Sequence, residues 1–102
     1  MSQTTTRPSS GVRYAVEHAE GAQGEDILYR GFAYLPAAAL PLEVRVGASG
    51  AAVAQLDART MPEGAGDVAE MQREAAALLK MAVKAAGVAG RPPPRRVVRW
   101  RA

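Results

Sequence analysis

One segment of the sequence repeats its apolar residues with a helical period, and it constrains the fold more than any other. The apolar positions form a single stripe: Val68, Met71, Ala75, Leu78, Leu79, Ala82, Val83 and Ala86. Asp67 and Glu70 precede the stripe with the spacing of a capping box, and Gly87 follows it as a candidate left-handed end. We therefore predict a helix over Asp67–Ala86. A helix with one stripe must bury it against another layer, which would place Leu78 and Leu79 in the core.

The residues before this helix alternate between apolar and polar with the period of two that is typical of strands. The hairpin signal Gly47–Gly50 joins two of these segments, and Gly31 marks a bulge or a close backbone approach in another. The proline-bracketed segment Pro36–Pro41 is expected to be a connection with one helical turn. The predicted strands are Val12–Ala19, Ile27–Leu35, Leu42–Val46 and Ala51–Ala58.

These elements predict an α+β fold, an antiparallel meander of about four strands with one C-terminal helix packed on one face. We expect residues 1–10 to be a disordered N-terminal arm, residues 11–90 a single α+β domain, and residues 91–102 a basic Pro/Arg-rich tail. The prolines of the tail would act as a stiff spacer that points the chain away from the helix end. Two interpretations of the alternating segment after them stay open: a further strand whose arginines face water, or a basic peptide that binds nucleic acid.

The tail also carries the clearest charge feature of the sequence. Five of the 13 basic residues lie within 91–102, which contains no acid, so the rest of the chain has eight basic against ten acidic residues. Arginine forms bidentate hydrogen bonds with carboxylates and phosphates, and tryptophan is a frequent anchor of interfaces. We predict partner contacts through Arg91, Arg95, Arg96, Val98, Arg99, Trp100 and Arg101, with Arg73, Lys80 and Lys84 of the helix as further candidates.

We interpret the chain as a small non-enzymatic protein-interaction or assembly module. Its acidic body lacks the broad basic face of a nucleic-acid domain, so a protein partner or self-association is favoured over nucleic acid. The alternative is an RNA- or DNA-binding accessory protein in which Trp100 stacks on a base. The sequence has no cysteine, no apolar run of about 20 residues and no secretory signal, so we expect a cytoplasmic protein without a membrane contact. The excess of Arg over Lys and the abundance of Ala indicate a bacterial origin.

His18 is the only histidine and the only candidate for acid–base catalysis. A general base needs a partner within hydrogen-bond reach, which the loop carboxylates of Glu20, Glu25 or Asp26 would supply. This enzyme or ligand-site interpretation is the remote alternative. We interpret His18 as a residue at the end of a strand, and we predict no catalytic residue.

Two further patterns are weak indications of a bound group. Gly64–Ala69 has the spacing of a dinucleotide fingerprint, but Glu63 and Asp67 place negative charge where a pyrophosphate would bind. One histidine without any cysteine leaves only carboxylates as metal ligands, and these lack the spacing of a calcium loop. We therefore predict no cofactor, no metal site and no small-molecule substrate.

Overall fold

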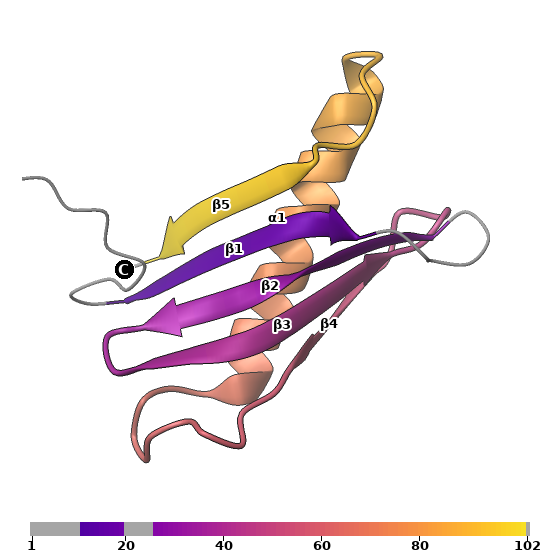
Figure 1. Ribbon diagram of the computed structural model, residues 1–102. Coiled ribbons are helices and arrows are strands. Elements are labelled where there is room, and N and C mark those ends of the chain that lie inside the picture. Colours follow the sequence, from indigo (N-terminus) through magenta and orange to yellow (C-terminus); the bar gives the residue numbers. More distant parts are fainter. Residues whose placement is uncertain (1–10, 20–25, 102) are drawn as a thin grey trace, which may run out of the picture.

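The computed structural model describes residues 11–19 and 26–101, which form a five-stranded antiparallel sheet with one helix across one face (Figure 1). The sheet order is β4-β3-β2-β1-β5, so the last strand of the chain lies beside the first. The predicted α+β fold is confirmed, whereas the expected arm at residues 1–10 lies outside the described residues. The elements are β1 (Val12–Ala19), β2 (Ile27–Leu35), β3 (Ala38–Val46), β4 (Ala52–Leu56), α1 (Val68–Val88) and β5 (Arg96–Arg101).

The Arg-rich end of the chain is a strand of this sheet. β5 pairs with β1 along its whole length, and Val97 of β5 is buried in the core. The prolines do not point the chain away from the helix. The connection lies beside the sheet, because the Tyr29 hydroxyl donates a 2.7 Å hydrogen bond to the Pro94 carbonyl. The further strand predicted for the end of the tail is observed at residues 96–101.

β3 starts earlier than the sequence indicated. The helical turn expected at Pro36–Pro41 is wrong, because a tight turn at residues 36 and 37 leads directly into β3 at Ala38. Pro41 fits within this strand because the ladder to β4 begins only at Leu42. The Pro41 carbonyl accepts a 2.9 Å hydrogen bond from the Asp57 amide, just beyond β4, so the missing N–H interrupts no ladder.

α1 begins where the sequence predicted and ends two residues later. The Asp67 side chain caps its first turn. Gly87 stays helical, and Gly90 instead adopts the left-handed conformation, with φ of 71°. The Arg91 amide then donates to the Ala86 carbonyl at 2.8 Å and the Gly90 amide to the Gly87 carbonyl at 3.1 Å. This pair of bonds is a Schellman motif, which satisfies carbonyls of the last turn.

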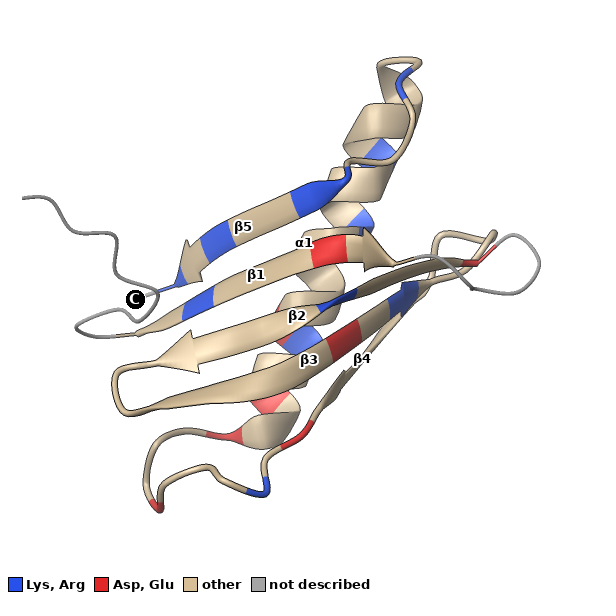
Figure 2. Cartoon of the chain, in the orientation of Figure 1, with Lys and Arg blue, Asp and Glu red and all other residues tan. Residues whose placement is uncertain are grey.

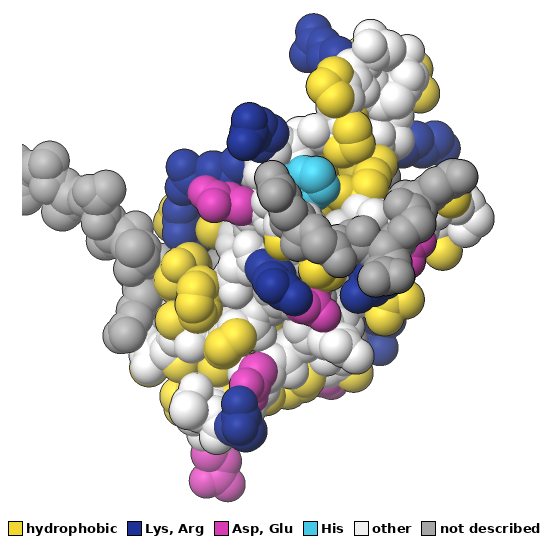
Figure 3. All heavy atoms as spheres, turned by 45° about the vertical axis from the view of Figure 1, so that its right-hand side comes forward, with side chains coloured by type: hydrophobic (Ala, Val, Ile, Leu, Met, Phe, Trp, Pro, Cys, Tyr) yellow, Lys and Arg dark blue, Asp and Glu magenta, His cyan; other side chains and the backbone are white. Residues whose placement is uncertain are grey.

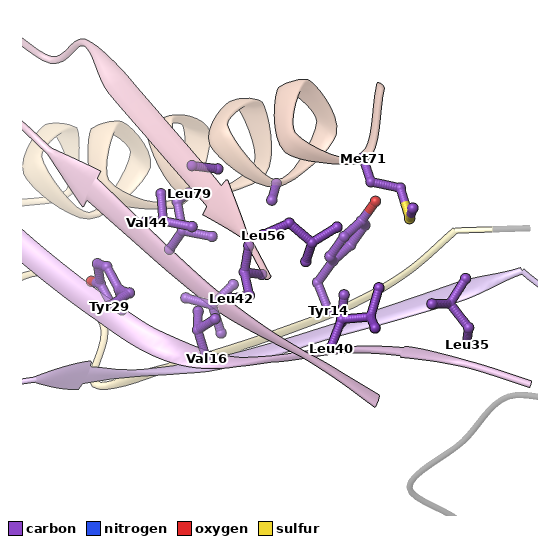
Figure 4. Close-up of a cluster of buried hydrophobic side chains, with 14 of the residues drawn as sticks. Tyr14, Val16, Tyr29, Leu35, Leu40, Leu42, Val44, Leu56, Met71 and Leu79 are labelled. Atoms are coloured by element: carbon purple, nitrogen blue, oxygen red, sulfur yellow. The ribbon is translucent and has the colours of Figure 1, made fainter. Parts of the chain in front are cut away.

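The core lies between α1 and the sheet (Figure 4). Leu79 is 1% exposed, but Leu78 is only half-buried, so one of the two leucines predicted for the core lies at its margin. Two tyrosines from the central strands, Tyr14 and Tyr29, are the largest side chains in this layer and are almost completely buried. Packed around them are Val16, Leu40, Leu42, Val44, Leu56 and Met71.

Both buried tyrosines keep a hydrogen-bond partner for the hydroxyl. Tyr14 donates to Glu74 Oε1 of α1 at 2.7 Å, and Tyr29 donates to the Pro94 carbonyl. Burial is the main reason that the pKa of each phenol is raised, and the Glu74 carboxylate raises the pKa of Tyr14 further. Both hydroxyls therefore stay protonated and act as hydrogen-bond donors. The Tyr14 hydroxyl links the sheet to α1, and the Tyr29 hydroxyl links it to the connection before β5.

The close backbone approach predicted at Gly31 is confirmed. Gly31 pairs with Val16 of β1, and a Cβ atom at this position would lie 1.9 Å from the Ala15 carbonyl oxygen and 2.7 Å from the Val16 Cα. Backbone atoms of a neighbouring strand cannot move aside as a flexible side chain can. Glycine is therefore required at position 31, where the backbones of the paired strands β1 and β2 approach each other this closely.

Candidate interaction surface

The face of the sheet opposite α1 carries the exposed aromatic residues of the molecule. We call it the open face, because no element among residues 11–19 and 26–101 packs across it (Figure 1). Phe32 is 40% exposed, Val53 64% and Trp100 57%, whereas Leu28 is the one buried side chain on this face within the described residues. Side chains of both charges lie among these apolar groups (Figure 3). Exposed apolar area of this kind makes the open face the candidate interaction surface.

The register of the sheet arranges the open face in three rows that cross β3, β2, β1 and β5 in that order. The aromatic row is Ala39, Tyr34, Arg13 and Trp100. The apolar row is Pro41, Phe32, Ala15 and Val98. The charged row is Glu43, Arg30, Glu17 and Arg96, with signs that alternate from strand to strand.

Arg13 lies at the centre of the aromatic row. Its guanidinium carbon is 5.2 Å from the Tyr34 ring centroid on one side and 5.5 Å from the Trp100 ring centroid on the other. The rings of Phe32 and Tyr34 are 5.7 Å apart, which extends the contact into the apolar row. Cation–π contacts at exposed sites stabilise an arrangement of this kind by about 0.5–1 kcal/mol each. Arg13, Phe32 and Tyr34 were not predicted as site residues, although their alternation placed them on one side of each strand.

The charged row and its surroundings supply carboxylates as well as arginines (Figure 2). Arg30 Nε donates to Glu43 Oε2 at 3.1 Å within the row. Beside the row, a shallow hollow of about 710 Å³ lies between β2 and the end of β4, with Phe32 and Asp57 in its lining. Hydrogen bonds from Arg59 lower the pKa of Asp57 to about 2, so this carboxylate is charged at neutral pH.

β5 divides the arginines predicted as partner contacts between the two faces of the sheet. Arg96, Val98 and Trp100 lie on the open face. On the helix side, Arg101 forms a 3.3 Å ion pair with Glu74 of α1, and Val97 enters the core. Val98 and Trp100, which were predicted as partner contacts, therefore lie on the open face, whereas Val97 packs the strand onto the core.

One outward backbone group is occupied by a side chain at each edge of the sheet. His18 and Arg95 form a hydrogen-bonded pair of the β1–β5 ladder, so the backbone groups of Val98 point away from β1. Arg99 Nη1 donates a 2.8 Å hydrogen bond to the Val98 carbonyl. At the opposite edge, the Leu56 amide of β4 donates to Gln72 Oε1 at 3.0 Å.

The remaining predicted contact residues do not form one cluster. Arg91 and Arg99 line a groove of about 440 Å³ together with alanines of α1, and Arg96 of the edge strand β5 borders it. Lys80 and Lys84 line a different hollow against the turn at residues 47–50. Arg73 is exposed on α1, and Arg95 is exposed just before β5. The structure therefore does not bring the helix lysines and the C-terminal arginines together.

His18 lies on the surface at the end of β1. Its ring centroid is 5.7 Å from that of Tyr29, and its backbone amide is bonded to the Arg95 carbonyl. Of the loop carboxylates considered as its partners, Asp26 forms a 3.8 Å ion pair with Arg45 instead, and Glu20 and Glu25 lie outside the described residues. Across the described residues, no group of three or more potential metal-ligating side chains is gathered.

Comparison with known proteins gives no relative from which a role could be carried over: no family model, no curated protein and no solved structure matches the chain. In the part of the chain that the structure describes, no helix has both the length and the apolar character needed to cross a membrane. The geometry of the open face is therefore the basis for any functional argument.

Proposed function

We propose that the protein is a non-enzymatic interaction module that binds a protein partner through the open face, with Arg96, Val98 and Trp100 of the Arg-rich strand among the contacts. One observation carries the proposal: the exposed aromatic residues Phe32 and Trp100 lie in adjacent rows of a face that no described element covers. Large apolar side chains exposed together cost solvation free energy in the isolated protein, and a partner would recover it. The chain has no cysteine and so no disulfide that would need an oxidising compartment, and we propose that the interaction takes place in the cytoplasm.

The charges of the open face favour a protein over a nucleic acid. Glu17 and Glu43 lie within the charged row, and Asp57 lies at the hollow beside it. These carboxylates would repel phosphate groups, whereas arginines and carboxylates in alternation suit the mixed charges of a protein surface. Trp100, half-exposed beside Arg13, has the chemistry of an interface anchor.

Photo-crosslinking in cells tests this proposal directly. A photoreactive phenylalanine analogue at Phe32 is expected to give a covalent adduct with a protein. The same analogue at Val88, which is 82% exposed at the end of α1, is the matched control and should give none. Absence of any protein adduct at Phe32, with the variant folded, would contradict a protein partner on the open face.

A second candidate function is the binding of single-stranded nucleic acid on the same face. The observation in its favour is the aromatic row, because Tyr34, Arg13 and Trp100 in line resemble a platform on which successive bases stack. Trp100 is the only tryptophan, so its fluorescence reports on this surface alone. Binding would quench this fluorescence and weaken steeply with salt. Unchanged fluorescence over a titration with single-stranded oligonucleotides at low salt excludes this candidate.

A further inference from the structure

We infer that the protein partner of the open face is a second copy of this chain. The two copies would pack face to face about a two-fold axis that runs parallel to the strands between β1 and β2. This inference rests on the proposed function, because it names the partner of the same surface. A two-fold axis in this position reverses the strand order β3-β2-β1-β5 in the second copy. β3 of one copy therefore lies opposite β5 of the other, and β2 lies opposite β1. Facing sheets in a sandwich stack in this way about 10 Å apart.

The charged row is self-complementary about this axis. Glu43 on β3 lies across Arg96 on β5 of the second copy, and Arg30 on β2 lies across Glu17 on β1. The symmetry repeats each pair, so the row gives four contacts between opposite charges. Within one copy, Glu43 and Arg96 are three strands apart, or about 14 Å, and do not pair. Their proximity would arise only in the dimer.

The other two rows are complementary in size and chemistry about the same axis. In the apolar row, the large Phe32 lies across the small Ala15, and Pro41 lies across Val98. In the aromatic row, Trp100 lies across Ala39. Large residues opposite small ones allow two layers to interdigitate without strain.

The last facing pair is Tyr34 with Arg13 of the second copy. Arg13 already lies against Tyr34 and Trp100 within its own chain, so the guanidinium would be enclosed by rings from both copies. All three rows therefore fit one symmetry operation. Leu28, which is buried in the monomer, lies beyond these rows and is not needed for the contact.

The two neighbouring axes that also run parallel to the strands bring like charges together. An axis along β2 would place Arg30 opposite Arg30 of the second copy and Glu43 opposite Glu17. An axis along β1 would place Glu17 opposite Glu17 and Arg30 opposite Arg96. Antiparallel pairing of two β5 edges would gather the arginines of both strands. Among the axes parallel to the strands, the one between β1 and β2 avoids these repulsions.

The size of the facing area sets the expected strength. Four strands at about 4.8 Å spacing and three rows at about 7 Å spacing cover roughly 19 Å by 20 Å. This is small beside the roughly 800 Å² per partner of a standard stable interface, so we expect a reversible dimer that dissociates in the micromolar range. Trp100 lies within this area, and its fluorescence should shift to shorter wavelength as the concentration rises.

Charge reversal across the axis tests the arrangement by sedimentation velocity over a concentration series. Glu43→Arg alone and Arg96→Glu alone should each weaken self-association by about 100-fold or more, because each creates two repulsive contacts in the dimer. A mixture of the two single variants should form a heterodimer within about tenfold of the wild-type affinity, because Arg at 43 then faces Glu at 96 and Glu43 faces Arg96. Glu63→Arg, at an exposed position of the connection between β4 and α1, is the matched control and should leave self-association unchanged.

Each result decides the inference. A wild-type protein that stays monomeric at about 1 mM overturns the second copy as partner, and a dimer that both reversals leave intact overturns the assigned axis. Failure of the mixture to associate, with both variants folded by circular dichroism, overturns it as well. The photo-crosslink at Phe32 separates this inference from the proposed function. An adduct with a different protein, together with a monomeric wild type, would uphold the proposed function while overturning the second copy.

Discussion

The two faces of the sheet both carry aromatic side chains, but those on the helix side are buried and those on the open face are exposed. On the helix side, Tyr14 and Tyr29 are almost fully buried, and each hydroxyl has a hydrogen-bond partner. On the open face, Phe32 and Trp100 keep about half of their surface in contact with solvent and lie beside charged residues of both signs. Within the described residues, the buried set on the helix side contains no charged side chain.

This contrast separates the core of a small domain from the surface that we propose for binding. A core excludes water, so every polar group that enters it must be paired. A reversible interface needs a surface that is stable in water and still complementary to a partner. The row of Tyr34, Arg13 and Trp100 would suit the second requirement, because a charged guanidinium lies between two aromatic rings on the surface.

The largest expected effect on stability comes from removing β5, which contributes side chains to the core and to the open face. A chain that ends at Arg95 loses the ladder between β1 and β5 and exposes the core where Val97 is buried. We expect this chain to lose cooperative thermal unfolding, because a domain of this size has little stability to spare. Circular dichroism melting checks the expectation, with removal of Ala102 alone as the control. A cooperative transition close to that of the full chain would mean that β5 is not an integral strand.

A pair of truncations sharpens the comparison between the layers. Leu79→Ala should lower the free energy of unfolding by about 2–5 kcal/mol, because its side chain is 1% exposed. Val53→Ala on the open face should change it by about 0.5 kcal/mol or less, because Val53 is 64% exposed. Urea denaturation measures both values in dilute protein. Equal losses in the two variants would contradict the difference between the faces.

The buried tyrosines predict how the helix side responds to alkaline pH. Their pKa values are raised in the folded protein, so above about pH 10 the unfolded chain has lost phenolic protons that the folded chain still holds. Stability should therefore be unaffected by these groups below pH 10 and should fall above it, by up to about 1.4 kcal/mol per pH unit for each tyrosine. Urea denaturation between pH 8 and pH 11 tests the sign. Tyr14→Phe should make the decline shallower, and an unchanged slope would count against Tyr14 as a titrating core residue.

Only a small effect on stability is expected from truncating Trp100 on the open face. Trp100→Ala should cost about 1 kcal/mol or less in dilute protein, because Trp100 is 57% exposed and its main described contact is with Arg13. The melting temperature should therefore change little. A loss as large as that of Leu79→Ala would show that Trp100 belongs to the stabilising core and would remove the distinction between the two faces.

The sequence by itself determined the elements and their type. A period of two before residue 60 and a helical period after Asp67 sufficed for an α+β fold, because each period leaves one apolar side that requires a second layer. The capping side chain of Asp67 placed the start of α1, and Gly31 revealed a close approach of two strands. These features depend on neighbours within a few residues, so local chemistry was enough to predict them.

Local chemistry was not enough to assign the two sides of β5. Val97 and Val98 are adjacent, equally apolar and on opposite sides, so the alternation did not say which one would face the helix. The pairing with β1 decided which valine is buried. Val97 lies opposite Val16, whose side chain is in the core, so Val97 is also in the core and Val98 is on the open face.

The composition of the open face was likewise decided by tertiary structure alone. Arg13 and Trp100 come from opposite ends of the chain, and they meet only because β5 returns to lie beside β1. The alternating charges also appear only when β3, β2, β1 and β5 are read across the sheet. A strand register joins residues that are distant along the chain, and no local pattern in the sequence encodes that distance.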